Sequence, residues 1–150
     1  MKNEIEYNSI LVPIDGSNRS LNAVKYASKL AQLFGNSSIT ICHVVDNDKI
    51  KQISSYQGVN INQMEKKYNE QGEKFCKRAE QEAKTIGLDK NNIVSKVLFG
   101  VPVEEIIKLS ANFDIIVMAA RGKQHVTEFM IGHITDRVIR LSSIPVLIVP

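Results

Sequence analysis

The chain has 150 residues, enough for one domain with a sizeable core, and its 43% hydrophobic and 23% charged residues are ordinary for a globular protein. Nineteen lysines and arginines against 16 acidic residues give a net charge of +3, and the scattered basic residues give no support to nucleic acid as a partner. No apolar run reaches membrane-spanning length and residues 1–6 do not form a signal peptide, so we expect a cytoplasmic protein without a membrane partner.

Apolar runs and amphipathic patterns alternate along the first part of the chain. The sequence predicts a buried strand over residues 9–14, a helix over 18–34 that Ser17 caps, and a second buried strand over 38–45. The polar stretch 47–60 has no clear period. We expect a flexible loop there, with room for a helical turn.

The same alternation continues to the end of the chain. The remaining predicted elements are a long charged helix over 61–86, a strand over 93–99, a short helix over 103–110 that Pro102 starts, a strand over 115–118, a helix whose inward stripe is Ile134, Val138 and Leu141, and a strand over 146–149. Gly72 interrupts the long helix, which indicates a bend or close packing. The strand over 93–99 alternates in polarity, as is typical near a sheet edge.

Continuous apolar strands separated by amphipathic helices predict a parallel sheet with helices on both faces. Five such strands fit a flavodoxin-like, doubly wound α/β fold in one domain. Cys42 lies in a strand pattern and Cys76 in a helical one. We therefore expect buried thiols and neither a disulfide nor a metal site at either position.

Residues 114–149 carry the most informative pattern. An apolar run is followed by a turn with Gly122, then after nine residues by Gly132, a helical pattern and a second apolar run. Strand, glycine turn, loop, helix and strand form a unit that presents backbone N–H groups to an anion. Glycines suit that role because no Cβ keeps a phosphate away from the backbone.

This pattern resembles the signature of the universal stress protein family, which reads Gly, two residues, Gly, nine residues, Gly and then Ser or Thr. ATP-binding members wrap the triphosphate with it. Here Ala119 replaces the first Gly, Gly122 and Gly132 match, and His133 replaces the Ser or Thr. The resemblance covers nearly the whole chain and is weakest over 47–60. Its other matching segments are 9–17, 43–46, 100–102 and 144–149.

The resemblance implies a fold of the adenine-nucleotide alpha-hydrolase-like type with strand order 3-2-1-4-5. It also implies a homodimer paired through the final strand, and an ATP or AMP ligand, with Mg²⁺ as a companion of ATP. The binding residues that it implies are Pro13, Asp15, Val44, Met118, Ala119, Arg121, Gly122, Gly132, His133, Ile134 and Thr135. In doubly wound sheets a ligand binds where the winding reverses, here between the first and fourth strands, and Asp15 and Gly122 follow those strands.

Each implied role has a plainer alternative. Asp15 either contacts the adenine or ribose end of the nucleotide or caps the following helix. Pro13 and Val44 either flank the adenine or pack in the core. Gly122 and Gly132 either approach phosphate or serve as turn glycines with positive φ.

Three further positions carry alternatives that concern the phosphates. Arg121 either reaches a phosphate or is a solvent-exposed charge. His133 either donates an N–H to the terminal phosphate or fills the phosphate slot with its bulk, and Thr135 offers a spare hydroxyl nearby. Ala119 costs little if its φ is negative, and otherwise strains the turn or narrows the gap beside the ribose. His43, by contrast, is interpreted as a satisfied histidine at a strand end.

The sequence thus predicts a cytoplasmic adenine-nucleotide sensor or regulator that acts on an unknown protein partner. The alternative is a member of the same fold that binds no nucleotide and works by protein contact, with its crevice blocked at Ala119 and His133. A flavodoxin-like electron carrier or a phosphoacceptor receiver has less support. Established catalytic motifs are missing from the sequence, so any ATP hydrolysis is expected to be slow.

Overall fold

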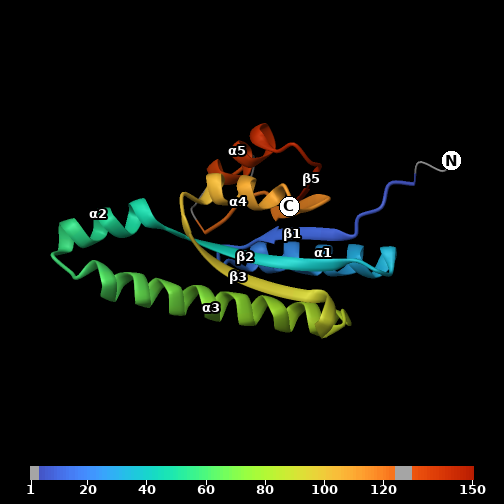
Figure 1. The fold of residues 1–150 in the computed structure, drawn as a ribbon, viewed down its shortest axis with the longest axis horizontal. Coiled ribbons are helices and arrows are strands. Elements are labelled where there is room, and N and C mark those ends of the chain that lie inside the picture. The colour runs from blue at the N-terminus through green and yellow to red at the C-terminus, as the bar shows by residue number, and fades with distance from the viewer. Residues whose placement is uncertain (1–3, 124–129) are drawn as a thin grey trace.

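The computed structural model describes residues 4–123 and 130–150. A single parallel sheet in the order β3-β2-β1-β4-β5 carries helices on both faces (Figure 1). This confirms the predicted fold class and strand order. The elements are β1 (Ser9–Pro13), α1 (Asn18–Phe34), β2 (Ser38–Asp46), α2 (Asn47–Gln57), α3 (Ile61–Ile86), the 3-10 turn η1 (Lys90–Asn92), β3 (Ile93–Gly100), α4 (Pro102–Ser110), β4 (Ile115–Ala119), α5 (His133–Leu141) and β5 (Val146–Val149).

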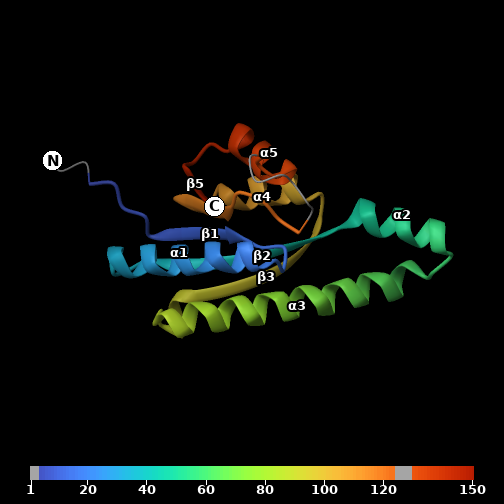
Figure 2. The same cartoon turned by 180° about the vertical axis from the view of Figure 1, so that it is seen from behind.

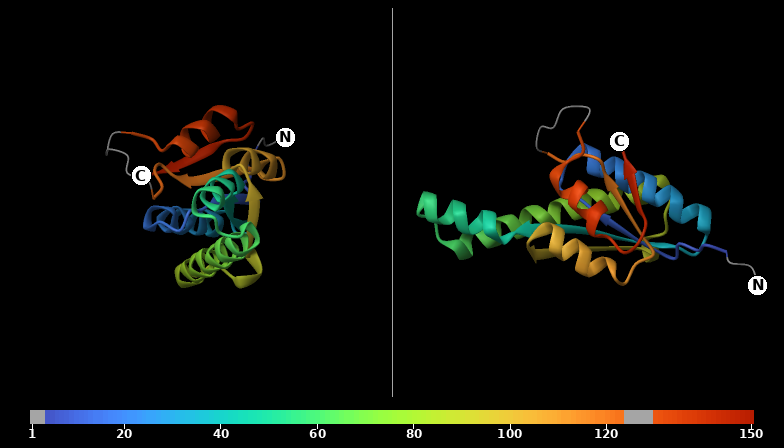
Figure 3. Two further views of the ribbon diagram at one scale, coloured as in Figure 1. Left: turned by 90° about the vertical axis from the view of Figure 1, so that its left-hand side faces the viewer. Right: turned by 90° about the horizontal axis from the view of Figure 1, so that it is seen from above.

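Two hydrophobic layers form because successive side chains of a strand point to opposite faces of the sheet. On β1, Ile10 and Val12 pack with α1 and α3, whereas Leu11 packs with α4 and α5. The three side chains are fully buried, and each contributes about 1.5–3 kcal/mol of transfer free energy to folding. Figures 2 and 3 show α3 and α5 on opposite sides of the sheet. The face a residue occupies therefore decides which helix layer it meets.

Local signals fix the ends of the two long helices. The Ser17 side chain accepts the Ser20 N–H at the start of α1, and Gly35 ends that helix. Asn60 caps α3, and Gly87 ends it in the left-handed conformation. Inside α3, a Cβ at Gly72 would lie 2.9 Å from the His43 ring and 3.1 Å from Val97. Of the two predictions for Gly72, close packing is therefore the one observed.

The structure corrects the prediction of a loop over residues 47–60, because 47–57 form the helix α2. Asp46 caps α2 by accepting the N–H groups of Asp48 and Lys49. Ile50 is buried, and Ile53 packs beside it against Val45 and Met64. Two inward apolar residues are too few to give a readable helical period, which is why the sequence pattern missed the helix. With the first turns of α3, α2 extends beyond the sheet (Figures 1 and 3).

The predicted inward stripe of the last helix is also corrected. Val138 is fully buried, but Ile134 is 39% exposed and Leu141 is 55% exposed. Thr135 takes the inward place beside Val138. The hydroxyl of Thr135 is satisfied there, so the polar residue faces the core and two apolar residues face outward.

Candidate functional site

The sequence-predicted crevice lies at the carboxyl ends of β1 and β4, which are neighbours in the sheet. After β1 the chain enters α1, which packs on one face, and after β4 it leads to α5 on the other face. The winding of the sheet therefore reverses between these two strands. In open α/β sheets that reversal leaves a crevice in which ligands bind.

Asp15 joins the two loops of this crevice. One carboxylate oxygen, Oδ1, accepts the Ser17 N–H at 3.0 Å, and the other, Oδ2, accepts the Lys123 N–H at 2.8 Å. Burial alone would raise the pKa of Asp15, but the hydrogen bonds from Ser17, Lys123 and Ser20 outweigh it and hold the pKa below its ordinary value. Asp15 is thus an ionised bridge between the β1–α1 turn and the loop after β4. Ser17, not Asp15, is the N-cap of α1, and Asp15 supports that cap residue through its N–H while it also holds the Lys123 N–H.

Gly122 has no room for a side chain, whereas a Cβ at Gly132 would make ordinary contacts with the neighbouring turn. The interpretation of both as turn glycines with positive φ is wrong, because neither has a positive φ. A Cβ on Gly122 would collide with Oδ2 of Asp15. A Cβ on Gly132 would lie 3.4 Å from the Ala120 carbonyl oxygen, to which the Gly132 N–H donates at 2.7 Å. The two signature glycines therefore meet the same short turn, although residues 124–129 between them lie outside the described part of the chain.

Ala119 and Thr135 have structural partners inside the subunit. Ala119 has a negative φ, and its methyl group packs in the layer that contains α1. The replacement of the signature's first glycine therefore causes no backbone strain. Thr135 is buried, and its hydroxyl donates to the Ala119 carbonyl oxygen at 2.9 Å. That hydroxyl is engaged and is not the spare donor that the sequence predicted.

The amino-terminal end of α5 lies beside the turn 120–122. Its N-cap is Gly132, which has no side chain to satisfy the first N–H groups, and His133 is an exposed first helical residue. Asp136 in the first turn is paired with Arg140 at 3.0 Å. An uncapped helix start of this kind attracts an anion through its N–H groups and its dipole.

Three apolar candidates share one face of the sheet. Val44 and Met118 belong to the layer that α4 and α5 cover, and Pro13 points to the same side as Leu11, two residues earlier on β1. Pro13 and Met118 are buried, whereas Val44 is partly exposed. The structure thus brings these candidates together at the ends of three adjacent strands.

Phe75 of α3 is a site residue that sequence reasoning missed. Its ring lies against Gly16, where a Cβ would collide with it, and contacts the His43 ring edge to face at a centroid distance of 5.2 Å. The Lys123 ammonium lies 4.2 Å from the Phe75 ring centroid. In the sequence Phe75 is one member of the apolar stripe of a helix, and no local signal separates it from the others.

His43 has the role that the sequence predicted. Its Nδ1 lies 2.9 Å from the Ile14 carbonyl oxygen, which identifies a satisfied histidine at a strand end. Burial lowers the pKa of His43, as does the nearby Lys123, while the Ile14 hydrogen bond and the Asp15 charge oppose that shift. A neutral ring therefore faces Phe75.

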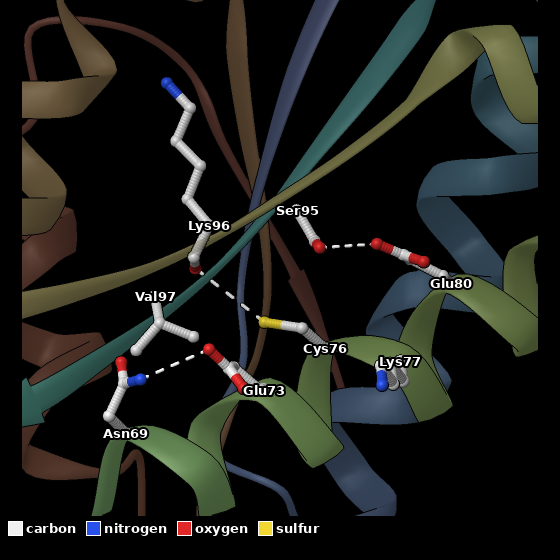
Figure 4. Close-up of a pocket in the computed structure, with 8 residues that line it drawn as sticks. All are labelled: Asn69, Glu73, Cys76, Lys77, Glu80, Ser95, Lys96 and Val97. Carbon is white, nitrogen blue, oxygen red and sulfur yellow. Dashed lines mark hydrogen bonds between the residues drawn. The ribbon is translucent and has the colours of Figure 1, made fainter. Parts of the chain in front are cut away.

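A hollow of about 370 Å³ lies between α3 and β3 (Figure 4). The Cys76 thiol points into it, 3.7 Å from the Lys96 carbonyl oxygen, and burial raises the pKa of Cys76 to about 11. Burial likewise raises the pKa of Cys42 to about 12. Both thiols are free and stay protonated near neutral pH. Within residues 4–123 and 130–150, no cluster of His, Cys, Asp and Glu side chains is arranged to hold a metal ion, and no helix could cross a membrane.

Comparison with known proteins decides the family. Residues 6–150 match the family model described as the universal stress protein family. The chain belongs to the universal stress protein family. It is 28% identical to universal stress protein MJ0577 of Methanocaldococcus jannaschii, with 97% of this chain and 96% of that protein covered. The solved structure of MJ0577 matches with a TM-score of 0.80 over 97% and 96% of the two chains.

Two solved structures of other universal stress proteins contain adenine nucleotides. One is a complex with cAMP, which is 24% identical and has a TM-score of 0.67 over 96% of this chain and 97% of that one. The other, from Archaeoglobus fulgidus, is a complex with dAMP, with 15% identity and a TM-score of 0.61 over 98% and 100% of the two chains. At these identities the likeness establishes a shared fold.

Proposed function

We propose that this universal stress protein binds an adenine nucleotide, ATP or AMP, and acts as a sensor or regulator. The observation that carries the proposal is the junction of Asp15, Gly122 and the uncapped start of α5 at the switch point of the sheet. The cAMP and dAMP complexes of fold relatives support the choice of ligand class. The competing hypothesis of a crevice blocked at Ala119 loses support, because that methyl group packs in the core.

The proposed binding residues fall into three groups, according to the part of the nucleotide that each group meets. Pro13, Val44 and Met118 form the apolar side for the adenine, and Asp15 accepts a donor from the base or the ribose. The phosphates meet Gly122, Gly132 and the first N–H groups of α5, with Arg121 and His133 adding positive charge or donors. Ala119, Ile134 and Thr135 contribute backbone at the edges of this region. Mg²⁺ would enter with ATP, held by the phosphates.

Titration calorimetry of the whole chain with ATP, ADP and AMP, each with Mg²⁺, tests the proposal. We expect a dissociation constant in the micromolar range, about −8 kcal/mol, for at least one nucleotide. Gly132→Val should abolish that binding while the protein stays folded, because the added methyl groups enter the space beside the Ala120 carbonyl. No measurable heat at millimolar nucleotide would contradict the proposal.

We further propose that the protein is a homodimer paired through β5. β5 lies at one edge of the sheet, and the side chain of its Leu147 is 39% exposed. An apolar edge strand needs a cover, and a second copy provides one through the same patch.

Because its proposed ligand is a cytoplasmic metabolite, we place the protein in the cytoplasm, where cell fractionation would detect it. As a regulator, the protein would act through contact with a protein partner.

A further inference from the structure

Phe75 contacts three segments of the chain, the turn after β1, strand β2 and the turn after β4. It lies on α3, outside the strand ends, yet its ring touches Gly16 after β1, His43 near the end of β2 and Lys123 after β4. Its side chain is partly buried between these segments. A single side chain thus joins the β1–α1 turn, β2 and the turn after β4.

Lys123 is anchored at two points. Its backbone N–H donates to Asp15, and its side-chain ammonium lies on the face of the Phe75 ring. His43 meets that ring in an edge-to-face contact and is neutral because it is buried, so it does not compete as a second cation. A cation on a partly buried aromatic face is held more firmly than the same cation in water.

The anchored residue is next to Gly122. On its far side the same short turn is held by the Gly132 N–H, which donates to the Ala120 carbonyl oxygen at 2.7 Å. The turn 120–123 is therefore fixed from two directions, by Gly132 on the α5 side and by Asp15 and Phe75 on the α1 and α3 side. Loss of either support would let Gly122 move away from Asp15.

We infer that Phe75 is a positioning residue for the nucleotide site: it holds Lys123 so that the turn 120–123 presents Gly122 to the phosphates. This inference rests on the proposed nucleotide binding. Phe75 acts through Lys123 and does not contact the ligand. A turn that is ordered before binding loses less conformational entropy when the ligand arrives, so the contact strengthens affinity.

A double-mutant cycle in ATP affinity tests the inference. Phe75→Leu keeps an apolar side chain but removes the aromatic face, and Lys123→Met keeps the backbone N–H but removes the charge. We expect each to weaken ATP binding about three- to tenfold, and the double variant to bind no more weakly than the worse single variant. The matched control is Lys77→Met, which removes an exposed charge from the same helix and should leave affinity unchanged.

A second measurement separates positioning from direct ligand contact. In the free wild-type protein, the ε-methylene protons of Lys123 should show an upfield ring-current shift in NMR spectra, and the Lys123 amide should exchange slowly. Phe75→Leu should remove the shift and speed the exchange.

The outcomes are distinct. Additive losses of affinity would mean that Phe75 and Lys123 act independently of each other, and would overturn the inference. If the wild-type protein bound no nucleotide, the proposed function would fail. The NMR comparison would then still decide the role of Phe75: faster Lys123 exchange in Phe75→Leu supports it, and unchanged exchange refutes it. If Phe75→Leu failed to fold, Lys123→Met alone would have to reproduce the loss of protection, and an unchanged amide would refute the inference.

Discussion

At the residue scale, the close approach of Asp15 to Gly122 explains why a glycine follows Arg121. Gly122→Ala would force its new methyl group into Oδ2 of Asp15, so the turn must withdraw and the Lys123 N–H must leave the carboxylate. A hydrogen bond to a charged group contributes about 1.5–3 kcal/mol, and we expect a loss of that size in the free energy of unfolding by urea. On an Asp15→Ala background the same substitution should cost little. Equal costs on both backgrounds would show that the carboxylate is not the obstacle.

The lowered pKa of His43 makes the free energy of unfolding depend on pH. Its pKa in the folded protein lies below the ordinary 6.5, so the folded state binds fewer protons than the unfolded state in the range between the two values. The contribution of neutral His43 to the free energy of unfolding is fully present above pH 6.5, and it is lost as the pH falls through the pKa of His43 in the folded state. Urea unfolding from pH 8 to pH 5 should show this decline. His43→Asn places an amide N–H donor where Nδ1 lies and does not titrate, so a decline of the same size in that variant would exclude His43 as the cause.

At the element scale, the start of α5 determines how His133 acts. The first N–H groups of α5 have no side-chain cap, and the exposed His133 stands beside them as the first helical residue. If ATP binds there and an imidazole N–H donates to a phosphate, His133→Ala should weaken ATP binding about tenfold or more, the cost of losing a hydrogen bond to a charged group. His133→Ser, the residue type of the family signature, keeps a donor and should bind more tightly than His133→Ala. Equal ATP affinity in the wild-type protein and His133→Ala would exclude a phosphate contact by His133.

Elements whose ends carry their own signals could be predicted from the sequence, and elements defined by tertiary contact could not. The bounds of α1, α3 and β5 agree with the sequence prediction, because Ser17 and two glycines mark the helices and a continuous apolar run marks the strand. α2 was missed because its inward face holds only Ile50 and Ile53. The site divides in the same way. Asp15 and Gly122 follow strands and fit a spaced motif, whereas Phe75 enters the crevice from a helix distant in sequence.

At the scale of the whole molecule, the register of β5 determines which of its backbone groups would be available for pairing in the proposed dimer. The Ile116 N–H donates to the Pro145 carbonyl oxygen at 2.9 Å, and the Ala120 N–H donates to the Val149 carbonyl oxygen at 2.8 Å. Both backbone groups of a strand residue point to the same side, and the side alternates along the strand. Leu147 therefore directs its N–H toward β4, and Ile148 directs its N–H outward to the free edge.

This register predicts different effects for two proline variants that test the proposed dimer. Ile148→Pro removes an outward donor, so the protein should stay folded and shift toward monomer, whereas Leu147→Pro removes a donor to β4 and should mainly lower stability. Size-exclusion chromatography with light scattering should give the wild-type protein about twice the 16.8 kDa chain mass. Thermal unfolding of the two variants provides the matched comparison. A wild-type protein that runs as a monomer at high micromolar concentration would contradict the pairing. An Ile148→Pro variant that remains fully dimeric would also contradict it, because antiparallel pairing of two β5 edges needs the outward Ile148 N–H on both copies.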